Sequence, residues 1–219
     1  MILGIETATP RASLALYDSR ADEVVWKRDF TTERAHNAVI FEPILEMMND
    51  YRDQLTGIVV GVGPGSYSGV RVGIAVANGL SLSMSLPALG RSSLEAWEVG
   101  EDSYAVISDA RRQSFAVSEV LKRKLQGEPE LIETGEVEAK LEEISGRGIP
   151  VYSAESAVVE AYEAVTLAHP DAAKLAREVG KGNPADWSEA PLEPHYLRAP
   201  YITTPKKGRG EVTSGRIKA

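Results

Sequence analysis

The sequence predicts an α/β fold of two small lobes, each built on a mixed sheet flanked by helices. Three β-rich segments open the chain, at residues 1–6, 12–18 and 22–31, with turns at 10–11 and 18–20 between them. Helical and strand-like segments then alternate, which is typical of parallel strands joined by crossover helices. The second half repeats this alternation more faintly, so we place the lobe boundary near residue 100.

Each further element is predicted from its local pattern. After the opening strands we expect a helix at about 37–51, a strand at 58–62, a helix at about 67–86 and a strand at 86–90. Pro43 requires the first of these helices to kink or to start later. The run Ser92-Ser93-Leu94-Glu95 has the capping chemistry that opens another helix. In the second half we expect strands at 104–108, 114–121 and 150–153 and helices near 136–144, 155–165 and 171–179.

Three antiparallel strands followed by alternating helix and strand match one lobe of the actin/hexokinase-like fold. The predicted domains are an N-terminal lobe at 1–100 with interface helices, a smaller C-terminal lobe at 101–200, and a basic tail at 201–219. The tail lacks apolar periodicity and is expected to be disordered. It carries a net charge of +4, so the preceding residues carry −12 of the chain's total of −8. The tail is either a solvated terminus or a weak electrostatic contact with RNA or an acidic partner.

Composition restricts the function classes. The net charge of −8 argues against this chain being the main nucleic-acid-binding component of an assembly. The 219 residues include no cysteine, which excludes a disulfide framework and a thiolate site. No apolar run is long enough to span a membrane, and the opening strand leaves no room for a signal peptide. We therefore expect a cytoplasmic protein.

A glycine-rich segment at residues 57–71 is a candidate anion site. An apolar strand runs through a Gly-Pro-Gly turn into a helix. Backbone N–H groups at Gly63, Gly65 and Ser66 would therefore lie at the positive end of a helix dipole, where they could bind an anion. Arg71 lies one turn into that helix and could add a bidentate contact. The spacing fits neither a P-loop nor a dinucleotide fingerprint. The alternative is a tight turn that requires glycine only for its backbone angles.

Charged residues near strand ends are further candidates. Glu6 ends the first strand and precedes Thr7; it either faces a nucleotide phosphate or metal, or caps the turn at 7–9. Asp109 precedes Arg111 and Arg112 at another strand end, where a lobe-bridging ion pair is favoured over an arginine presented to a nucleotide. None of the three histidines pairs with another ligand at metal-binding spacing. We expect neither a metal site nor a catalytic residue.

The two helices of the first lobe have more apolar surface than packing on one sheet requires. In the first, Ile44 and its helical neighbours form one apolar stripe, and Phe41, Leu45 and Met48 form another. The second helix is rich in small residues, which allow close helix–helix approach. We expect a protein interface here, and the alternative is a buried pair of core helices. The candidate interface residues are His36, Ile40, Ile44, Met48, Val70, Ile74 and Ala77.

Four segments in order resemble the TsaB (YeaZ) family, the non-catalytic partner proteins in tRNA threonylcarbamoyladenosine synthesis. The most specific is Gly-Pro-Gly-Ser-Tyr-Ser-Gly-Val-Arg at residues 63–71. The others are Met-Ile-Leu-Gly-Ile-Glu-Thr-Ala-Thr at 1–9, Ser-Asp-Ala-Arg-Arg-Gln at 108–113 and Pro-His-Tyr-Leu-Arg at 194–198. The resemblance covers roughly residues 1–200 and is weakest between Val120 and Glu189.

The resemblance implies a subunit that binds and activates the TsaD transferase, which with the TsaE ATPase modifies adenosine 37 of tRNA to form t6A. Such a subunit has no cofactor of its own, forms a homodimer when alone, and contacts tRNA only within the complex. ATP or ADP would lie at the interface shared with TsaD, in contact with Glu6, Thr7, Gly63, Gly65, Ser66 and Arg71. The paired histidines for which TsaD is known are missing here.

An alternative of a different class is a free-standing actin/hexokinase-like enzyme, either an ATP-dependent kinase or a peptidase. The chain is too short for a full two-lobed kinase with an adenosine-binding lobe.

Overall fold

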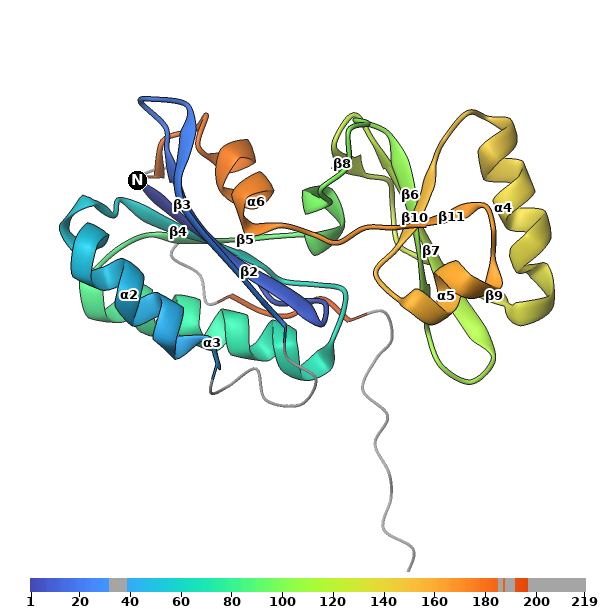
Figure 1. The fold of residues 1–219 in the computed structure, drawn as a ribbon, viewed down its shortest axis with the longest axis horizontal. Coiled ribbons are helices and arrows are strands. Elements are labelled where there is room, and N and C mark those ends of the chain that lie inside the picture. The colour runs from blue at the N-terminus through green and yellow to red at the C-terminus, as the bar shows by residue number, and fades with distance from the viewer. Residues whose placement is uncertain (32–38, 185–186, 188–191, 197–219) are drawn as a thin grey trace, which may run out of the picture.

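The computed structural model of the chain describes residues 1–31, 39–184, 187 and 192–196. Two lobes lie side by side, each with its own sheet (Figure 1). The first sheet has the strand order β3-β2-β1-β4-β5, and the second has the order β11-β10-β6-β7-β8 with β9 also paired to β7. Among these described residues, no helix is long and apolar enough to cross a membrane. His36 and the tail at 201–219 lie outside the described residues.

The first lobe follows the predicted order closely. Its elements are β1 (Ile2–Glu6), β2 (Arg11–Asp18), β3 (Glu23–Thr31), α2 (Phe41–Tyr51), β4 (Gly57–Gly61), α3 (Tyr67–Met84) and β5 (Ala88–Arg91), with short 3-10 helices at Arg52–Gln54 and Ser93–Ala96. β2 runs antiparallel to β1 and β3, whereas β4 runs parallel to β1 and β5. This mixed sheet and its flanking helices confirm the predicted fold class for the lobe.

The second lobe contains a second mixed sheet. Its elements are β6 (Tyr104–Asp109), β7 (Ser114–Leu121), β8 (Lys124–Leu125), β9 (Glu130–Glu133), a 3-10 helix (Thr134–Glu136), α4 (Val137–Gly146), β10 (Val151–Ser153), α5 (Ser156–Ala161) and β11 (Val165–Leu167). The last helix among the described residues is α6 (Ala172–Val179). β6 pairs antiparallel with β7 and parallel with β10. Sequence analysis did not predict β8, β9 or β11.

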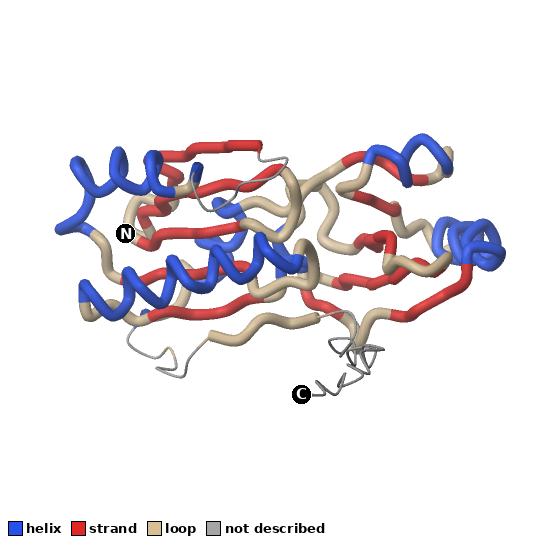
Figure 2. The backbone as a smooth tube through the Cα atoms, turned by 90° about the horizontal axis from the view of Figure 1, so that it is seen from below, coloured by secondary structure: helices blue, strands red, loops and turns tan. Residues whose placement is uncertain are grey.

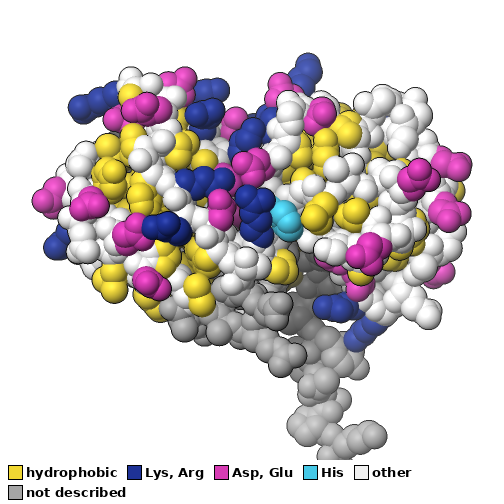
Figure 3. Space-filling view, in the orientation of Figure 1, with side chains coloured by type: hydrophobic (Ala, Val, Ile, Leu, Met, Phe, Trp, Pro, Cys, Tyr) yellow, Lys and Arg dark blue, Asp and Glu magenta, His cyan; other side chains and the backbone are white. Residues whose placement is uncertain are grey.

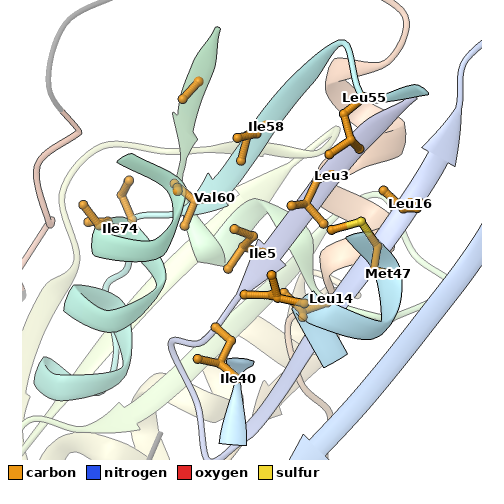
Figure 4. Close-up of a cluster of buried hydrophobic side chains, with 14 of the residues drawn as sticks. Leu3, Ile5, Leu14, Leu16, Ile40, Met47, Leu55, Ile58, Val60 and Ile74 are labelled. Carbon is orange, nitrogen blue, oxygen red and sulfur yellow. The ribbon is translucent and has the colours of Figure 1, made fainter. Parts of the chain in front are cut away.

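Helices α2 and α3 cover one face of the first sheet (Figure 2). Alternate residues of the strands, such as Leu3 and Ile5 of β1, point at these helices and meet Met47 and Ile74 in the main core (Figure 4). Pro43 occupies the first turn of α2, where a backbone N–H has no intrahelical acceptor. The proline is therefore tolerated in α2, which begins at Phe41.

The placement of α6 corrects the predicted domain limits. This helix falls within the expected C-terminal lobe, yet it packs on the first sheet, on the face opposite α2 and α3 (Figure 1). The Ala172 N–H donates to Ser13 Oγ at 2.9 Å. A Cβ on Gly4 would lie 2.2 Å from the Ala172 carbonyl oxygen, so glycine allows the helix to approach β1. The chain therefore crosses between the lobes twice, near residue 100 and again near 170.

The segment expected to open an α-helix at Ser92 instead forms the 3-10 helix Ser93–Ala96. The Ser92 Oγ does cap it, accepting from the Leu94 N–H at 3.3 Å. The helix ends there because Trp97 turns into the first crossing and pairs with Pro170.

Candidate functional site

The glycine turn between β4 and α3 packs against the turn between β1 and β2. Gly63 has a φ of +92°, which L side chains rarely adopt. A Cβ on Gly65 would lie 2.3 Å from the Ala8 carbonyl oxygen, and one on Gly69 would lie 2.1 Å from the Thr7 carbonyl oxygen. The turn therefore requires glycine for a backbone angle at one position and for close approach at two others.

This packing uses N–H groups that were expected to face a phosphate. The Ser66 N–H donates to the Ala8 carbonyl at 2.7 Å. The Ser66 Oγ caps α3 by accepting from the Gly69 N–H at 3.3 Å. The Gly63 N–H in turn donates to Ser93 Oγ at 3.2 Å. The expectation of free N–H groups is therefore wrong at Gly63 and Ser66, because oxygens of the chain itself accept from them.

Glu6 is buried at the end of β1. Its Oε1 accepts from the Ala8 N–H at 2.7 Å, so the carboxylate caps the turn at 7–9, one of the two predicted roles. Its Oε2 has no hydrogen-bond partner among the described residues. A Cβ on Gly61 would lie 2.0 Å from this oxygen, so glycine at 61 leaves room for the carboxylate. Burial raises the pKa of Glu6 to about 7, against the lowering effect of the hydrogen bond from Ala8.

We expect Glu6→Gln to remove a pH dependence from the free energy of unfolding. With a folded-state pKa raised from 4.5 to about 7, Glu6 binds its proton more tightly in the folded state. The parent protein should therefore lose stability as pH rises through that window, by about 3 kcal/mol in total, and change little further above it. Gln stays neutral and keeps the acceptor for Ala8. Urea denaturation at several pH values gives the difference between the two proteins, and a constant difference would contradict the expectation.

Two other predicted nucleotide contacts have partners within the chain. Thr7 is buried, and its Oγ1 donates to the Gly69 carbonyl at 2.8 Å. Arg71 lies on the exposed side of α3, where its Nε donates to the Tyr196 hydroxyl at 3.0 Å. Its guanidinium lies 4.4 Å from the centroid of the Tyr67 ring, which in turn stacks on the Tyr196 ring at a centroid distance of 5.4 Å. The glycine motif and the segment near 195 therefore meet at this cluster.

A cleft of about 690 Å³ lies between the lobes, and the start of α3 forms part of its wall. The first lobe contributes the turn at 8–10, the glycine turn and the 3-10 helix before the crossing. The second lobe contributes the end of β6 and the start of α5. Both apolar and polar side chains line the cleft. The lining consists of residues 8–10, 64–67, Ser93, Leu94, Trp97, residues 106–111, Ser118, Ala154, Glu155, Pro170 and Tyr196.

The predicted lobe-bridging role of Asp109 and Arg111 needs correction. The Arg111 Nη1 lies 3.7 Å from Asp109 Oδ2, and the Arg111 N–H donates to Asp109 Oδ1 at 2.6 Å. Both groups belong to the hairpin between β6 and β7, whose residues 111–113 all have positive φ, so the pair stays within the second lobe. Asp109 and Arg111 line the cleft, whereas Arg112 lines a separate hollow beside β9.

Glu155 is a cleft residue that sequence analysis missed. It precedes α5, and both of its carboxylate oxygens accept from the Asp109 N–H at 3.3 Å. Burial raises the pKa of Glu155, and the neighbouring Asp109 carboxylate adds to the effect while Arg111 opposes it. Two carboxylates thus lie together on the second-lobe wall.

The arginine that does connect the lobes is Arg123, in the turn between β7 and β8. Its Nη1 and Nη2 donate to the carbonyls of Trp97 and Val99 at 3.3 and 3.1 Å, and its Nε donates to Asp102 Oδ1 at 2.9 Å. These bonds hold the first crossing against the second lobe. Arg123 lies within the basic run 122–124, a pattern that is typical of a solvated turn. Only its low exposure, 15% of the side chain, distinguishes it from its neighbours.

Most of the predicted interface residues lie in the core. Five side chains are buried within the first lobe and have no surface for a partner: Ile40, Ile44, Val70, Ile74 and Ala77. Met48 is half-buried at the edge of the same cluster. The apolar stripe that the sequence predicted as a protein interface therefore faces the sheet. For these residues the alternative interpretation, a buried pair of core helices, is the correct one.

The other stripe of the helix pair is exposed. Phe41 and Leu45 on α2 are 54% and 65% exposed, and Leu82 on α3 is 86% exposed. Gly79, one turn before Leu82, has nothing within 4 Å of a Cβ position. Hydrophobic side chains are visible over this region on the left of Figure 3. We call Phe41, Leu45, Gly79 and Leu82 the outer face of α2 and α3.

Within the part of the chain that the structure describes, no group of three or more His, Cys, Asp or Glu side chains could hold a metal ion.

Comparison with protein families gives one match along most of the chain. Residues 30–190 match the family of TsaD, described as tRNA N6-adenosine threonylcarbamoyltransferase. The chain is 38% identical over 96 residues to the tRNA threonylcarbamoyladenosine biosynthesis protein TsaB of Escherichia coli, covering 42% of this chain and 40% of that protein. The TsaB of Bacillus subtilis is 34% identical over 97 residues, with coverage of 43% and 42%. This chain thus covers about two fifths of each of these relatives.

Longer matches come from other proteins. An uncharacterised protein of Mycobacterium tuberculosis is 28% identical over 208 residues, which is 91% of this chain and 92% of that protein. A solved structure of a Pseudomonas aeruginosa protein described as similar to peptidase YeaZ has a TM-score of 0.67 at 19% identity, covering 90% of this chain and 99% of that one. The YeaZ structure from the same organism has a TM-score of 0.61 at 19% identity, with coverage of 84% and 96%. These two likenesses support the actin/hexokinase-like fold.

Proposed function

The chain belongs to the TsaD family of tRNA N6-adenosine threonylcarbamoyltransferases, in its TsaB (YeaZ) branch, and we propose that it acts in t6A formation as a non-catalytic subunit. In this proposal it binds the TsaD transferase and activates it for threonylcarbamoylation of tRNA adenosine 37. The TsaE ATPase completes the assembly, and tRNA touches this chain only within the complex. The observation that carries the proposal is the outer face of α2 and α3.

The outer face supports a protein partner for a physical reason. Phe41, Leu45 and Leu82 each expose about half or more of their side chain to water on two neighbouring helices. Large apolar side chains exposed on neighbouring helices of a globular protein favour an interaction site there. Gly79 leaves the helix backbone open to close approach, which favours packing against another helix. We propose that TsaD covers this face in the complex and that a second copy of the chain covers it otherwise.

We place the nucleotide, ATP or ADP, at the surface shared with TsaD. Within this chain the N–H groups of Ser66 and Gly69 are already bonded, and Glu6 and Thr7 are buried. The first-turn N–H groups of Tyr67 and Ser68 have no acceptor within the helix and remain for a phosphate oxygen. A partner would have to supply the rest of such a site.

Reconstitution with and without this chain tests the proposal. TsaD, TsaE, ATP, the threonylcarbamoyl donor and unmodified tRNA are incubated, and t6A is measured by mass spectrometry of the digested tRNA. We expect modification only when the chain is added, with no ATP hydrolysis or tRNA modification by the chain alone. Multiple turnovers from the purified chain would favour the kinase or peptidase alternative. Equal t6A formation without the chain would exclude the activating role.

A further inference from the structure

The first-lobe rim of the cleft carries an exposed aromatic ring. Tyr67, in the first turn of α3, lines the cleft and is 56% exposed. Tyr196 stacks on this ring with 25° between the ring planes, and the Arg71 guanidinium also lies over it. Because Arg71 donates to the Tyr196 hydroxyl, these two groups lie together on one face of Tyr67. The contacts fix the orientation of the ring and leave its other face for a flat ligand.

The second-lobe wall of the cleft offers hydrogen-bond acceptors. Asp109 and Glu155 both line it. The Asp109 N–H donates to both oxygens of Glu155, and the Arg111 N–H donates to Asp109 Oδ1. An ionised carboxylate can accept about four hydrogen bonds, so these contacts leave acceptor positions on each group for a ligand. The wall therefore favours a ligand that donates and disfavours one that can only accept.

The surface between the ring and the carboxylates is largely apolar. Leu94 and Trp97 line it from the first lobe, and Val106 and Ala154 line it from the second. The volume of about 690 Å³ falls in the range of about 300–1,000 Å³ that is common for small-ligand sites. A nucleobase with an exocyclic amino group has the matching properties, because its faces stack on aromatic rings and its edge donates hydrogen bonds to carboxylates.

We propose that the cleft binds one unpaired RNA base that carries an exocyclic amino group, adenine or cytosine. The base stacks on Tyr67 and donates from its amino group to Asp109 or Glu155. Uracil presents a carbonyl oxygen at the corresponding position, which the carboxylates repel. The inference rests on the proposed function for the presence of RNA. One stacked base gives only weak binding, which agrees with the net charge of −8 and becomes effective when the complex holds the tRNA nearby.

Titration of the isolated chain with the ribotrinucleotides AAA, CCC and UUU tests the base preference. The chain has three tryptophans, and the indole N–H of Trp97 reports on the cleft by nuclear magnetic resonance once Trp97→Phe has assigned its signal. A pH of 8 keeps the carboxylates ionised. We expect AAA and CCC to bind at least about tenfold more tightly than UUU. Equal binding of the three, or no shift of the Trp97 signal with any of them, would overturn the proposal.

Substitutions on the two walls separate stacking from base recognition. Asp109→Asn combined with Glu155→Gln keeps the side-chain sizes and adds amide donors, so the preference for AAA over UUU should fall below about threefold. Tyr67→Ala should weaken AAA binding about tenfold, whereas Tyr67→Phe keeps the ring and should bind as the parent does. Glu160→Gln, an exposed position on α5 outside the cleft lining, should change nothing. A preference that survives the double substitution would contradict the proposed contacts, as would AAA binding that ignores Tyr67→Ala.

ADP distinguishes an RNA base from a free nucleotide, since it carries the same adenine on a diphosphate. We expect ADP to bind no more tightly than AAA, because the carboxylates of the second-lobe wall repel its clustered charge. Binding of ADP at least about tenfold tighter than AAA would overturn the assignment to RNA. This test and the reconstitution of t6A formation fail separately. A chain that activates TsaD but shows no base preference would contradict only the present inference, and a chain with the preference but no activation would contradict only the proposed function.

Discussion

Leu45→Asp is expected to weaken association strongly while leaving the protein folded, whereas Ile44→Asp, one residue earlier, is expected to unfold it. Leu45 is 65% exposed, so a carboxylate there stays in water and costs the fold about 0.5 kcal/mol. Ile44 is 5% exposed within the main core. A carboxylate there loses both its hydration and the isoleucine packing, a cost of about 4 kcal/mol or more. This is a large part of the stability of an ordinary domain.

Two measurements on the same pair of variants check this result. Thermal unfolding followed by circular dichroism should give a parent-like melting temperature for Leu45→Asp and a much lower one for Ile44→Asp. Sizing and co-purification with TsaD should show binding weakened at least about 30-fold by Leu45→Asp, the effect of losing one central interface side chain. If Leu45→Asp binds TsaD and its own copies as the parent does, the outer face is not the interface.

Gly65→Ala is expected to destabilise the protein by about 3 kcal/mol, because the added methyl group would lie 2.3 Å from the Ala8 carbonyl oxygen. That oxygen belongs to the backbone and accepts from Ser66, so it cannot move away without breaking the contact between the glycine turn and the 8–10 turn. The same segment lines the cleft, so the substitution should also disturb the cleft wall.

The same substitution at Gly79 provides the control. Gly79 lies within α3, with no atom within 4 Å of a Cβ position. Alanine there should stabilise the helix by up to about 1 kcal/mol, since it lowers the entropy lost on folding. Urea denaturation compares the two variants. A Gly65→Ala protein as stable as the parent would show that the turn does not pack closely against Ala8.

The first lobe could be predicted from sequence because its signals are local. The opening strands are separated by turn residues, and the glycine turn lies between a β-branched run and a helical pattern. β8, β9 and β11 were missed because strands of two to four residues are too short to show an alternating pattern.

The direction in which α2 faces could not be predicted from its own residues. Both Ile44 and Leu45 belong to apolar stripes, and the sequence does not say which stripe lies on the sheet. The structure shows that Ile44 does and Leu45 does not. The cleft was missed for a related reason, since Glu155 and Arg123 gain their roles from contacts with residues far away in the chain. No local pattern marks such residues.

The return of α6 to the first sheet affects how the protein can fold during synthesis. The side of that sheet formed by Ile2, Tyr17 and Val59 is covered by Leu175, Ala176 and Val179, which the ribosome makes after the whole second sheet. Until then an apolar surface of the first lobe remains open to water or to other chains. A nascent chain that stops before α6 should therefore be the form most prone to aggregate or to recruit a chaperone.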